Sequence, residues 1–206
     1  MGALAAQPRK DSPQHPNGAC VEAKEKIKAN WMRTIELFAG GGGLALGLHQ
    51  AGFAPVAVVE RDADSCSTLR ENWHRAMKTE LKVFDRDVRH VDLTEWTDRV
   101  ELVSGGPPCQ PFSIAGKHGG YNDERDMFPH AVGVVRTVRP KAFIFENVRG
   151  LLRKSFAKYF GYVLLQLQYP EIRRKDRQSW QEHLATLEEH HTAGGDHGLR
   201  YRLVFT

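Results

Sequence analysis

Cysteine is scarce in this chain, and its spacing argues against two kinds of site. Only three cysteines occur, Cys20, Cys66 and Cys109, and no two of them form a CxxC pair. An odd, widely spaced set argues against a disulfide framework and against a zinc site built on cysteine. A reducing compartment such as the cytoplasm fits this cysteine usage best.

Long apolar runs are also missing. The longest apolar stretches have the length of short strands, whereas a membrane-spanning helix needs roughly 18 to 20 apolar residues. The first residues contain neither an apolar core nor basic residues ahead of one, so no secretory signal is expected. Ala6 stands where a myristoylation signal requires serine or threonine. The sequence therefore predicts a protein without a membrane segment.

The composition is that of an ordinary folded domain. The 206 residues are 41% apolar and 26% charged, which suits a soluble protein with one core. The formal net charge of +4 and the pI near 9.0 permit a polyanionic partner such as nucleic acid. A mild basic excess is also common among proteins that bind no polyanion, so the charge alone decides little.

Short apolar runs alternate with helical patterns along most of the chain. Residues 1–32 are rich in Pro, Gly, Lys and Gln and predict a flexible leader. From residue 33 onward, the alternation predicts βαβ units, a parallel sheet and the α/β class. The expected strands are 34–38, 56–60, 82–84, 101–105 and 141–146, and the expected helices are 44–52, 62–77 and 127–139.

Residues 150–198 have a different character. A helical pattern covers 151–168, and a charged, helix-compatible stretch covers 173–191. The basic run at 173–177 is interpreted as a solvated helix start rather than a DNA contact. The histidines near residue 190 lack the HExxH spacing, so no metal site is predicted. The last six residues, YRLVFT, predict a strand with nothing after it, which indicates an incomplete unit.

The unusual motifs all fall where predicted strands end. FAGGGG follows the first strand, Glu60 ends the second, GGPPCQPF follows the fourth and ENV ends the fifth. Ligands of open parallel sheets bind outside the carboxyl ends of the strands. The convergence of the motifs therefore predicts one site at this edge of the sheet.

FAGGGGLALGL places four consecutive glycines between a strand and a helix. Glycine lets the backbone pass close to a ligand, and the helix N-terminus offers free N–H groups, so we expect a cofactor loop. A tight turn that needs positive φ explains the glycines equally well. The segment fits the dinucleotide fingerprint GxGxxG only loosely. Glu60 stands where such folds bind ribose hydroxyls, while the charges after it are also explained as a helix start.

SGGPPCQPFS, residues 104–113, predicts a stiff loop. Its three prolines fix φ and remove backbone donors, which excludes a helix interior or a central strand. A free cysteine is usually a buried core residue, as we expect for Cys66, and Cys20 is expected to be exposed. Rigid prolines, room at 104–106 and the neutral donors Gln110 and Ser113 favour a reactive role for Cys109.

Glu146 and Asn147 follow the apolar run KAFIF. A carboxylate at the end of such a strand is expected to be half buried, which raises its pKa and suits a proton donor. A capping or salt-bridged glutamate is the structural alternative.

FAGGGGLALGL, GGPPCQPFS and ENVRGLL, in this order, resemble three motifs of the S-adenosylmethionine-dependent cytosine-C5 DNA methyltransferases over roughly residues 33–206. The resemblance implies a Rossmann-like class I methyltransferase fold, S-adenosyl-L-methionine as methyl donor and double-stranded DNA as substrate. A thiolate adds to C6 of a flipped cytosine in that reaction, which makes C5 nucleophilic enough to take the methyl group. Cys109 matches the nucleophile, Glu146 the carboxyl group on ring N3 and Asn147 its support.

The same resemblance implies the binding residues. Those expected around the cofactor are Phe38, Ala39, Gly40, Gly41, Gly42, Gly43, Glu60, Arg61, Asp87, Val88, Pro108 and Met127. Those expected at the DNA are Gln110, Ser113, Lys117 and Val148. DERDMF is one residue shorter than the usual family pattern, so Phe128 is an alternative to Met127. The segment around Ser113 and Lys117 also fits an ordinary flexible loop.

The resemblance covers only the first half of such an enzyme. After ENV we find no QRRxR-like segment and no target-recognition region. We therefore expect either a truncated product, with a C-terminally incomplete fold, or one subunit of a split enzyme whose partner chain supplies the rest. An RNA cytosine-C5 methyltransferase and a catalytically silent partner subunit are the alternatives. The expected setting is a prokaryotic restriction-modification system, on DNA in the cytoplasm.

Overall fold

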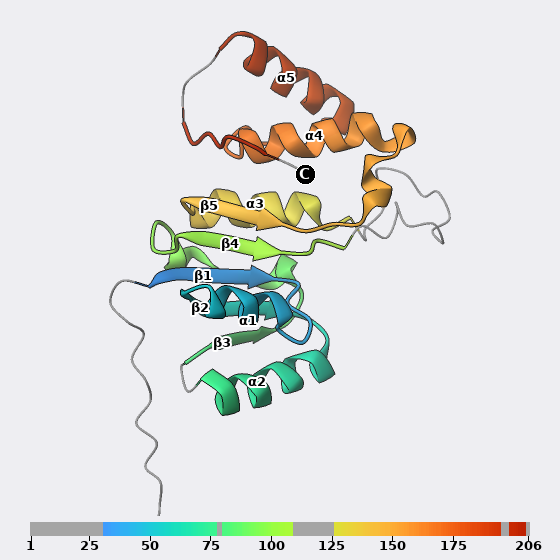
Figure 1. Ribbon diagram of the computed structural model, residues 1–206. Helices are drawn as coiled ribbons and strands as arrows, with labels where there is room; N and C mark the ends of the chain where they lie inside the picture. Colours follow the sequence, from blue (N-terminus) through green and yellow to red (C-terminus); the bar gives the residue numbers. More distant parts are fainter. Residues whose placement is uncertain (1–30, 78–79, 109–125, 195–197, 205–206) are drawn as a thin grey trace, which may run out of the picture.

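A parallel five-stranded sheet with the order β3-β2-β1-β4-β5 lies at the centre of the protein (Figure 1). The computed structural model describes residues 31–77, 80–108, 126–194 and 198–204. The strands are β1 (Met32–Leu37), β2 (Phe53–Glu60), β3 (Lys82–Asp85), β4 (Leu102–Gly105) and β5 (Ala142–Phe145). The predicted α/β class and all five predicted strands are confirmed, while the predicted leader lies largely outside the described residues.

Helices cover both faces of the sheet. α1 (Gly43–Gln50) and α2 (Ala63–Met77) lie on one face and α3 (Phe128–Val138) lies on the other (Figure 1). α4 (Ala157–Gln168) and α5 (Trp180–Thr192) are stacked beyond β5, with α5 outermost. None of the helices in the described ranges is both long and apolar enough to cross a bilayer.

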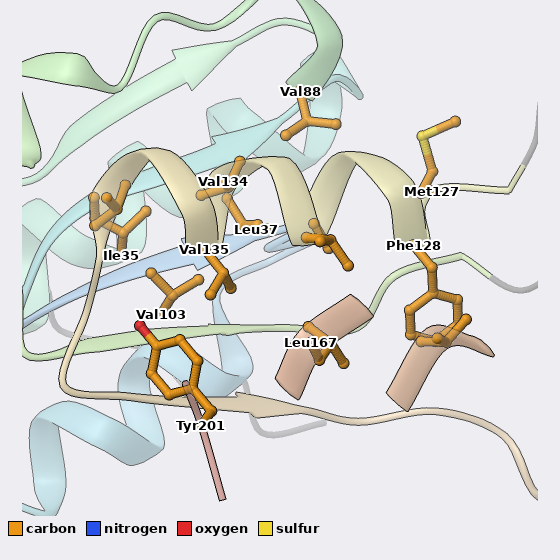
Figure 2. Packing of buried hydrophobic residues seen from close by; sticks show 14 of the residues in the cluster. Ile35, Leu37, Val88, Val103, Met127, Phe128, Val134, Val135, Leu167 and Tyr201 are labelled. Carbon is orange, nitrogen blue, oxygen red and sulfur yellow. The ribbon is translucent and has the colours of Figure 1, made fainter. Parts of the chain in front are cut away.

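The alternation of side chains along β1 explains the two packed faces. Ile35 and Leu37 are fully buried on the α3 side, where they meet Val103 of β4 and Val135 of α3 (Figure 2). A strand that is covered on both faces is expected to be apolar on both, but three of the six residues of β1 are polar, namely Arg33, Thr34 and Glu36. Thr34 and Glu36 are buried.

The C-terminal helices differ from the sequence prediction. The helix expected from residue 151 begins at Ala157, after two 3₁₀ turns, Arg149–Leu152 and Lys154–Phe156. Residues 173–179 are not helical, because Ser179 caps α5 instead. Its side chain accepts a hydrogen bond from the Glu182 N–H at 3.2 Å, and the Glu182 carboxylate accepts one from the Ser179 N–H at 2.7 Å. This capping box sets the helix start.

The predicted terminal strand is wrong for the residues that the structure describes. Residues 201–204 form no ladder, and 205–206 lie outside the described residues. The Tyr201 N–H donates to the carbonyl of Gln168 at 3.0 Å, and its hydroxyl donates to the carbonyl of Pro140 at 2.6 Å. These bonds hold the segment against the end of α4, so it does not pair with β5.

A buried histidine joins α4 to α5. His183 is 1% exposed, and its Nε2 lies 3.1 Å from the carbonyl oxygen of Ile172. Because a carbonyl can only accept, this nitrogen carries a proton, and Nδ1 lies 2.9 Å from the Tyr162 hydroxyl. Burial lowers the pKa of the imidazole, which favours the neutral ring with Nδ1 as acceptor.

Acidification is expected to weaken the α4–α5 contact through His183. The folded pKa lies below the ordinary value of 6.5, so the unfolded chain takes up a proton first as the pH falls. Below about 6.5, stability should fall by up to about 1.4 kcal/mol per pH unit from this group. Glu36 acts in the opposite sense, because burial raises its pKa from 4.5 to about 7 and the folded state binds the extra proton.

A comparison of the wild type with His183→Gln separates the two effects. Urea unfolding at neutral and at mildly acidic pH should show that the variant loses less stability on acidification than the wild type. Equal losses would mean that His183 does not carry the effect.

Candidate functional site

A cavity of about 320 Å³ opens at the carboxyl ends of the central strands. Seven of the residues around it were predicted from the sequence to bind a cofactor. These seven are Phe38, Glu60, Arg61, Asp87, Val88, Pro108 and Met127. The structure thus brings together residues from five separate segments of the chain.

Sequence reasoning missed three residues around this cavity, Val59, Arg86 and Arg89. The signal that could have found them is adjacency, since Val59 precedes Glu60 and the two arginines flank the Asp87–Val88 pair. The arginines place positive charge beside the two carboxylates of the cavity wall.

The glycine loop contacts the cavity through one carboxylate. The Gly40 N–H donates to Glu60 Oε2 at 2.8 Å, and Oε1 of the same side chain accepts from the N–H groups of Arg61 at 2.8 Å and Asp62 at 2.9 Å. Each carboxylate oxygen has two lone pairs, so three of four acceptor positions are used among the described residues. Glu60 therefore ties the loop after β1 to the start of α2 and retains one acceptor position.

The remaining loop residues shape the turn from β1 into α1. Gly42 has φ +86° and is the residue before the first turn of α1, a backbone conformation that glycine adopts without the steric cost of a Cβ. Ala39 is buried, and its N–H donates to the Val59 carbonyl at 3.2 Å. Ala39, Gly40, Gly41, Gly42 and Gly43 are not among the described residues that line the cavity.

Asp87 is held as an ionised carboxylate. It accepts from Arg89 Nε at 2.9 Å, from Arg89 Nη2 at 2.8 Å and from the Arg89 N–H at 2.9 Å. These bonds lower the pKa of the Asp87 carboxyl to about 2. Arg61 Nη1 lies 3.9 Å from the same carboxylate. The cavity therefore presents a fixed negative acceptor beside Val88.

Phe38 and Met127 supply apolar wall. Phe38 has φ +57°, a conformation that is uncommon for a residue with a Cβ, and its ring faces the cavity from the end of β1. Met127 and Phe128 point to opposite sides of the chain, with Met127 toward Val88 and Phe128 into the core (Figure 2). The one-residue ambiguity in DERDMF is thus resolved in favour of Met127 as the cavity residue.

Glu146 and Asn147 lie next to the segment that leads to Cys109. The Glu146 N–H donates to the Gly105 carbonyl at 3.0 Å, and Asn147 Nδ2 donates to the Pro107 carbonyl at 2.8 Å. Asn147 Oδ1 accepts from the Val148 N–H at 2.8 Å. The two loops are therefore tied together two residues before Cys109. Cys109, Gln110, Ser113 and Lys117 themselves lie outside the described residues.

One expectation near this loop needs correction. Glu146 is exposed rather than half buried, because β5 is the edge strand and no further strand pairs with its outer side among the described residues. Val148, expected at the DNA, is 54% exposed and lies on an apolar groove beside β5.

Cys66, the one cysteine among the described residues, is buried as predicted. Cys66 is fully buried in α2, and its thiol donates to the Glu60 carbonyl at 3.3 Å. Burial raises the pKa of this thiol to about 11, so it is unreactive at neutral pH. Cys20 lies outside the described residues.

The histidines near residue 190 take part in packing. His191 Nδ1 lies 2.8 Å from the Tyr169 hydroxyl, and the His190 ring packs edge-on against the Tyr169 ring. Across the described segments, no group of three or more His, Cys, Asp or Glu side chains is arranged to hold a metal ion.

Comparison with known proteins gives consistent matches. The Type II methyltransferase M.NgoMIV of Neisseria gonorrhoeae is 44% identical over 130 residues, which are 63% of this chain and 40% of the relative. M.AquIA of Picosynechococcus is 36% identical over 151 residues, which are 67% of this chain and 57% of the relative. A solved structure, described as a DNA modification methyltransferase encoded within an E. coli prophage, is 26% identical with a TM-score of 0.54. It is matched over 68% of this chain and 37% of its own.

The matched part is the part that forms the sheet and the cavity. The chain spans 40% of M.NgoMIV and 31% of M.PspPI from Psychrobacter, so these relatives are more than twice as long as the matched region. The sequence profile described as C-5 cytosine-specific DNA methylase matches residues 32–169, from β1 through α4. On this match, the chain belongs to the C-5 cytosine-specific DNA methylase family.

Proposed function

We propose that this chain is the cofactor-binding and catalytic portion of a DNA cytosine-C5 methyltransferase. The observation that carries the proposal is the cavity at the carboxyl edge of the sheet, with Phe38, Glu60 and Asp87 on its wall. A second loop pair, Pro107–Pro108 and Glu146–Asn147, lies at the same edge. A cofactor site and a reaction site side by side are what methyl transfer requires.

The hydrogen-bond acceptors and apolar side chains around the cavity fit S-adenosylmethionine. Carboxylates accept from hydroxyl and amino groups, so Glu60 suits ribose hydroxyls and Asp87 suits the adenine amino group. Phe38, Val88 and Met127 offer apolar surface to the adenine ring. When bound, the cofactor supplies the methyl group.

The chain's own residues would carry the rest of the reaction. The Cys109 thiolate adds to C6 of the flipped cytosine, and the carboxyl group of Glu146 holds ring N3 and stabilises the charge that develops there. C5 would then take the methyl group that the bound cofactor supplies, and the bond from that group to the cofactor would break. Loss of the C5 proton to a base and departure of the thiolate from C6 restore the ring. Asn147 positions the cysteine loop through its bond to Pro107.

We also propose that a second chain completes the enzyme at β5. An apolar groove of about 510 Å³ runs between the edge of β5 and residues 203–204, with α4 as its floor. Its exposed apolar residues are Ile144 (51%), Val148 (54%), Leu152 (55%) and Val204 (81%). A groove beside the edge of β5 suits an added strand, because β5 pairs only with β4 among the described residues. The occupant we propose is an apolar strand of a companion chain that carries the target-recognition region.

Covalent capture tests both proposals. The chain is incubated with S-adenosylmethionine and a duplex that carries 5-fluorocytosine, alone and together with the part of M.NgoMIV beyond the matched region. We expect an adduct that survives denaturation, stronger with the added fragment. Cys109→Ser should abolish it, because the Cys66 thiol is buried in α2, whereas Cys20→Ser should not change it.

Three results would contradict these proposals. An adduct that persists in Cys109→Ser shows that Cys109 is not the nucleophile. An adduct on tRNA carrying 5-fluorocytosine, with none on the duplex, assigns the chain to RNA. An equal yield of adduct with and without the fragment rejects the proposal that a companion chain completes the enzyme.

A further inference from the structure

Four basic residues follow the Glu146–Asn147 loop within a short stretch of chain. They are Arg149, Arg153, Lys154 and Lys158, which we call the basic strip. They lie on the two 3₁₀ turns and on the first turn of α4, and all four are exposed. The strip therefore begins at the carboxyl edge of the sheet, directly beside the proposed reaction site.

The basic strip has no negative charge of its own. No aspartate or glutamate occurs between Asn147 and Pro170. Within the described part of the chain, none of the four side chains lies in an ion pair, whereas other basic residues do. Those with a carboxylate within 4 Å are Arg61, Arg70, Arg75, Lys82, Arg89, Arg139 and Lys141. Exposed like charges that lie close together along the chain and have no ion-pair partner attract a polyanion.

The backbone of the strip is anchored, so its cations are presented at a defined place. Leu151 and Tyr159 are 3% and 1% exposed, and Phe156 packs against the same core. The Tyr159 hydroxyl donates to the carboxylate of Asp126, just before α3. The Lys158 ammonium lies 5.9 Å from the centre of the Trp180 ring. Anchoring reduces the entropy that is lost when these side chains bind a partner.

We propose that the basic strip binds backbone phosphates of the DNA duplex next to the target cytosine. This inference rests on the proposed function, because it places the duplex at the Glu146 edge. Arginine and lysine on exposed turns suit phosphate contacts, which position the duplex without reading its sequence. The strip would thus supply affinity and orientation, and the choice of site would come from elsewhere.

The salt dependence of binding tests the proposal with the full chain. The variant is Arg149→Gln/Arg153→Gln, and the matched control is Arg99→Gln/Lys141→Gln at the opposite edge of the sheet, before β4 and β5. Each pair removes two positive charges from the net +4, leaving +2. The dissociation constant for a short synthetic duplex is measured by fluorescence anisotropy between about 50 and 200 mM salt.

The slope of the logarithm of the association constant against the logarithm of the salt concentration is negative. We expect its magnitude to decrease by about 0.9 for each phosphate that the protein no longer neutralises, hence by about 1.8 in the strip variant. The control variant should keep the wild-type slope. Calorimetric binding of S-adenosylmethionine should be unchanged in both variants, which shows that the fold is intact.

Several outcomes would overturn the proposal. Equal slope changes in the two variants mean that only net charge matters, and an unchanged slope in the strip variant means that the strip does not bind phosphates. Absence of duplex binding by the wild type at the lowest salt also rejects it, as does tighter binding of polyglutamate or tRNA than of the duplex. Failure of the proposed function would give a different result. The wild type would then bind no cofactor and form no covalent adduct, while the strip variant would still show the reduced salt dependence of duplex binding.

Discussion

Replacing Gly105 by alanine is expected to lower the free energy of unfolding by about 3 to 5 kcal/mol. Gly105 is the last residue of β4 and lies opposite Leu37 of β1. A Cβ at this position would overlap the Leu37 carbonyl oxygen and lie 3.2 Å from the Leu37 Cβ. Because the obstacle is the backbone of a neighbouring strand, only separation of β1 from β4 could relieve the overlap.

Gly133→Ala is the matched control. Gly133 lies in α3, where a new Cβ would meet no atom within 4 Å. Alanine is a better helix former than glycine by up to about 1 kcal/mol, so this variant should be slightly more stable than the wild type. Urea unfolding of both variants measures the difference. Similar stabilities of the two alanine variants would show that β1 and β4 do not approach each other as described.

Replacing Glu60 by alanine is expected to weaken S-adenosylmethionine binding by about 100-fold. The carboxylate accepts from the Gly40 N–H and from two N–H groups at the start of α2. Hydrogen bonds to a charged group contribute about 1.5 to 3 kcal/mol each, and about 1.4 kcal/mol corresponds to a tenfold change in affinity. The variant loses both the restraint on the glycine loop and the acceptor position left for the ligand.

Two control variants make the Glu60 experiment specific. Glu60→Gln keeps one acceptor oxygen and should show a smaller loss of affinity. Glu71→Ala removes an exposed carboxylate of α2 that pairs only with Arg75 among the described residues, and it should bind like the wild type. Titration calorimetry gives the three dissociation constants. If Glu60→Ala bound S-adenosylmethionine with the affinity of the wild type, this cavity would not be the cofactor site.

Local patterns were sufficient to predict the architecture. Each strand is a short apolar run, each helix has a helical period, and glycine or proline stands where the chain turns, so β1 to β5 and α1 to α3 follow from nearby residues alone. The motifs at the strand ends pointed to the edge of the sheet where the cavity opens. Seven of the expected cofactor residues meet at one cavity because parallel strands end on a common side.

The helix starts of the C-terminal region were harder to predict, because a helical pattern of residues does not by itself fix where a helix begins. The chain between Leu151 and Ala157 has a helical pattern, but the structure forms two 3₁₀ turns that bury Leu151 and present the basic strip. Ser179 rather than residue 173 starts α5, because its capping box with Glu182 offers a better terminus than the charged run before it.

The sequence by itself determined the fold class, the order of the strands along the chain, and the motifs that identify the family, because all of these are written in short segments. Only the tertiary structure decided that Glu60 restrains the glycine loop, that Met127 rather than Phe128 faces the cavity, and that Glu146 is exposed. Each of these depends on which segments lie side by side in space. The exposure of Glu146 in particular follows from the position of β5 at the edge of the sheet, which no local pattern records.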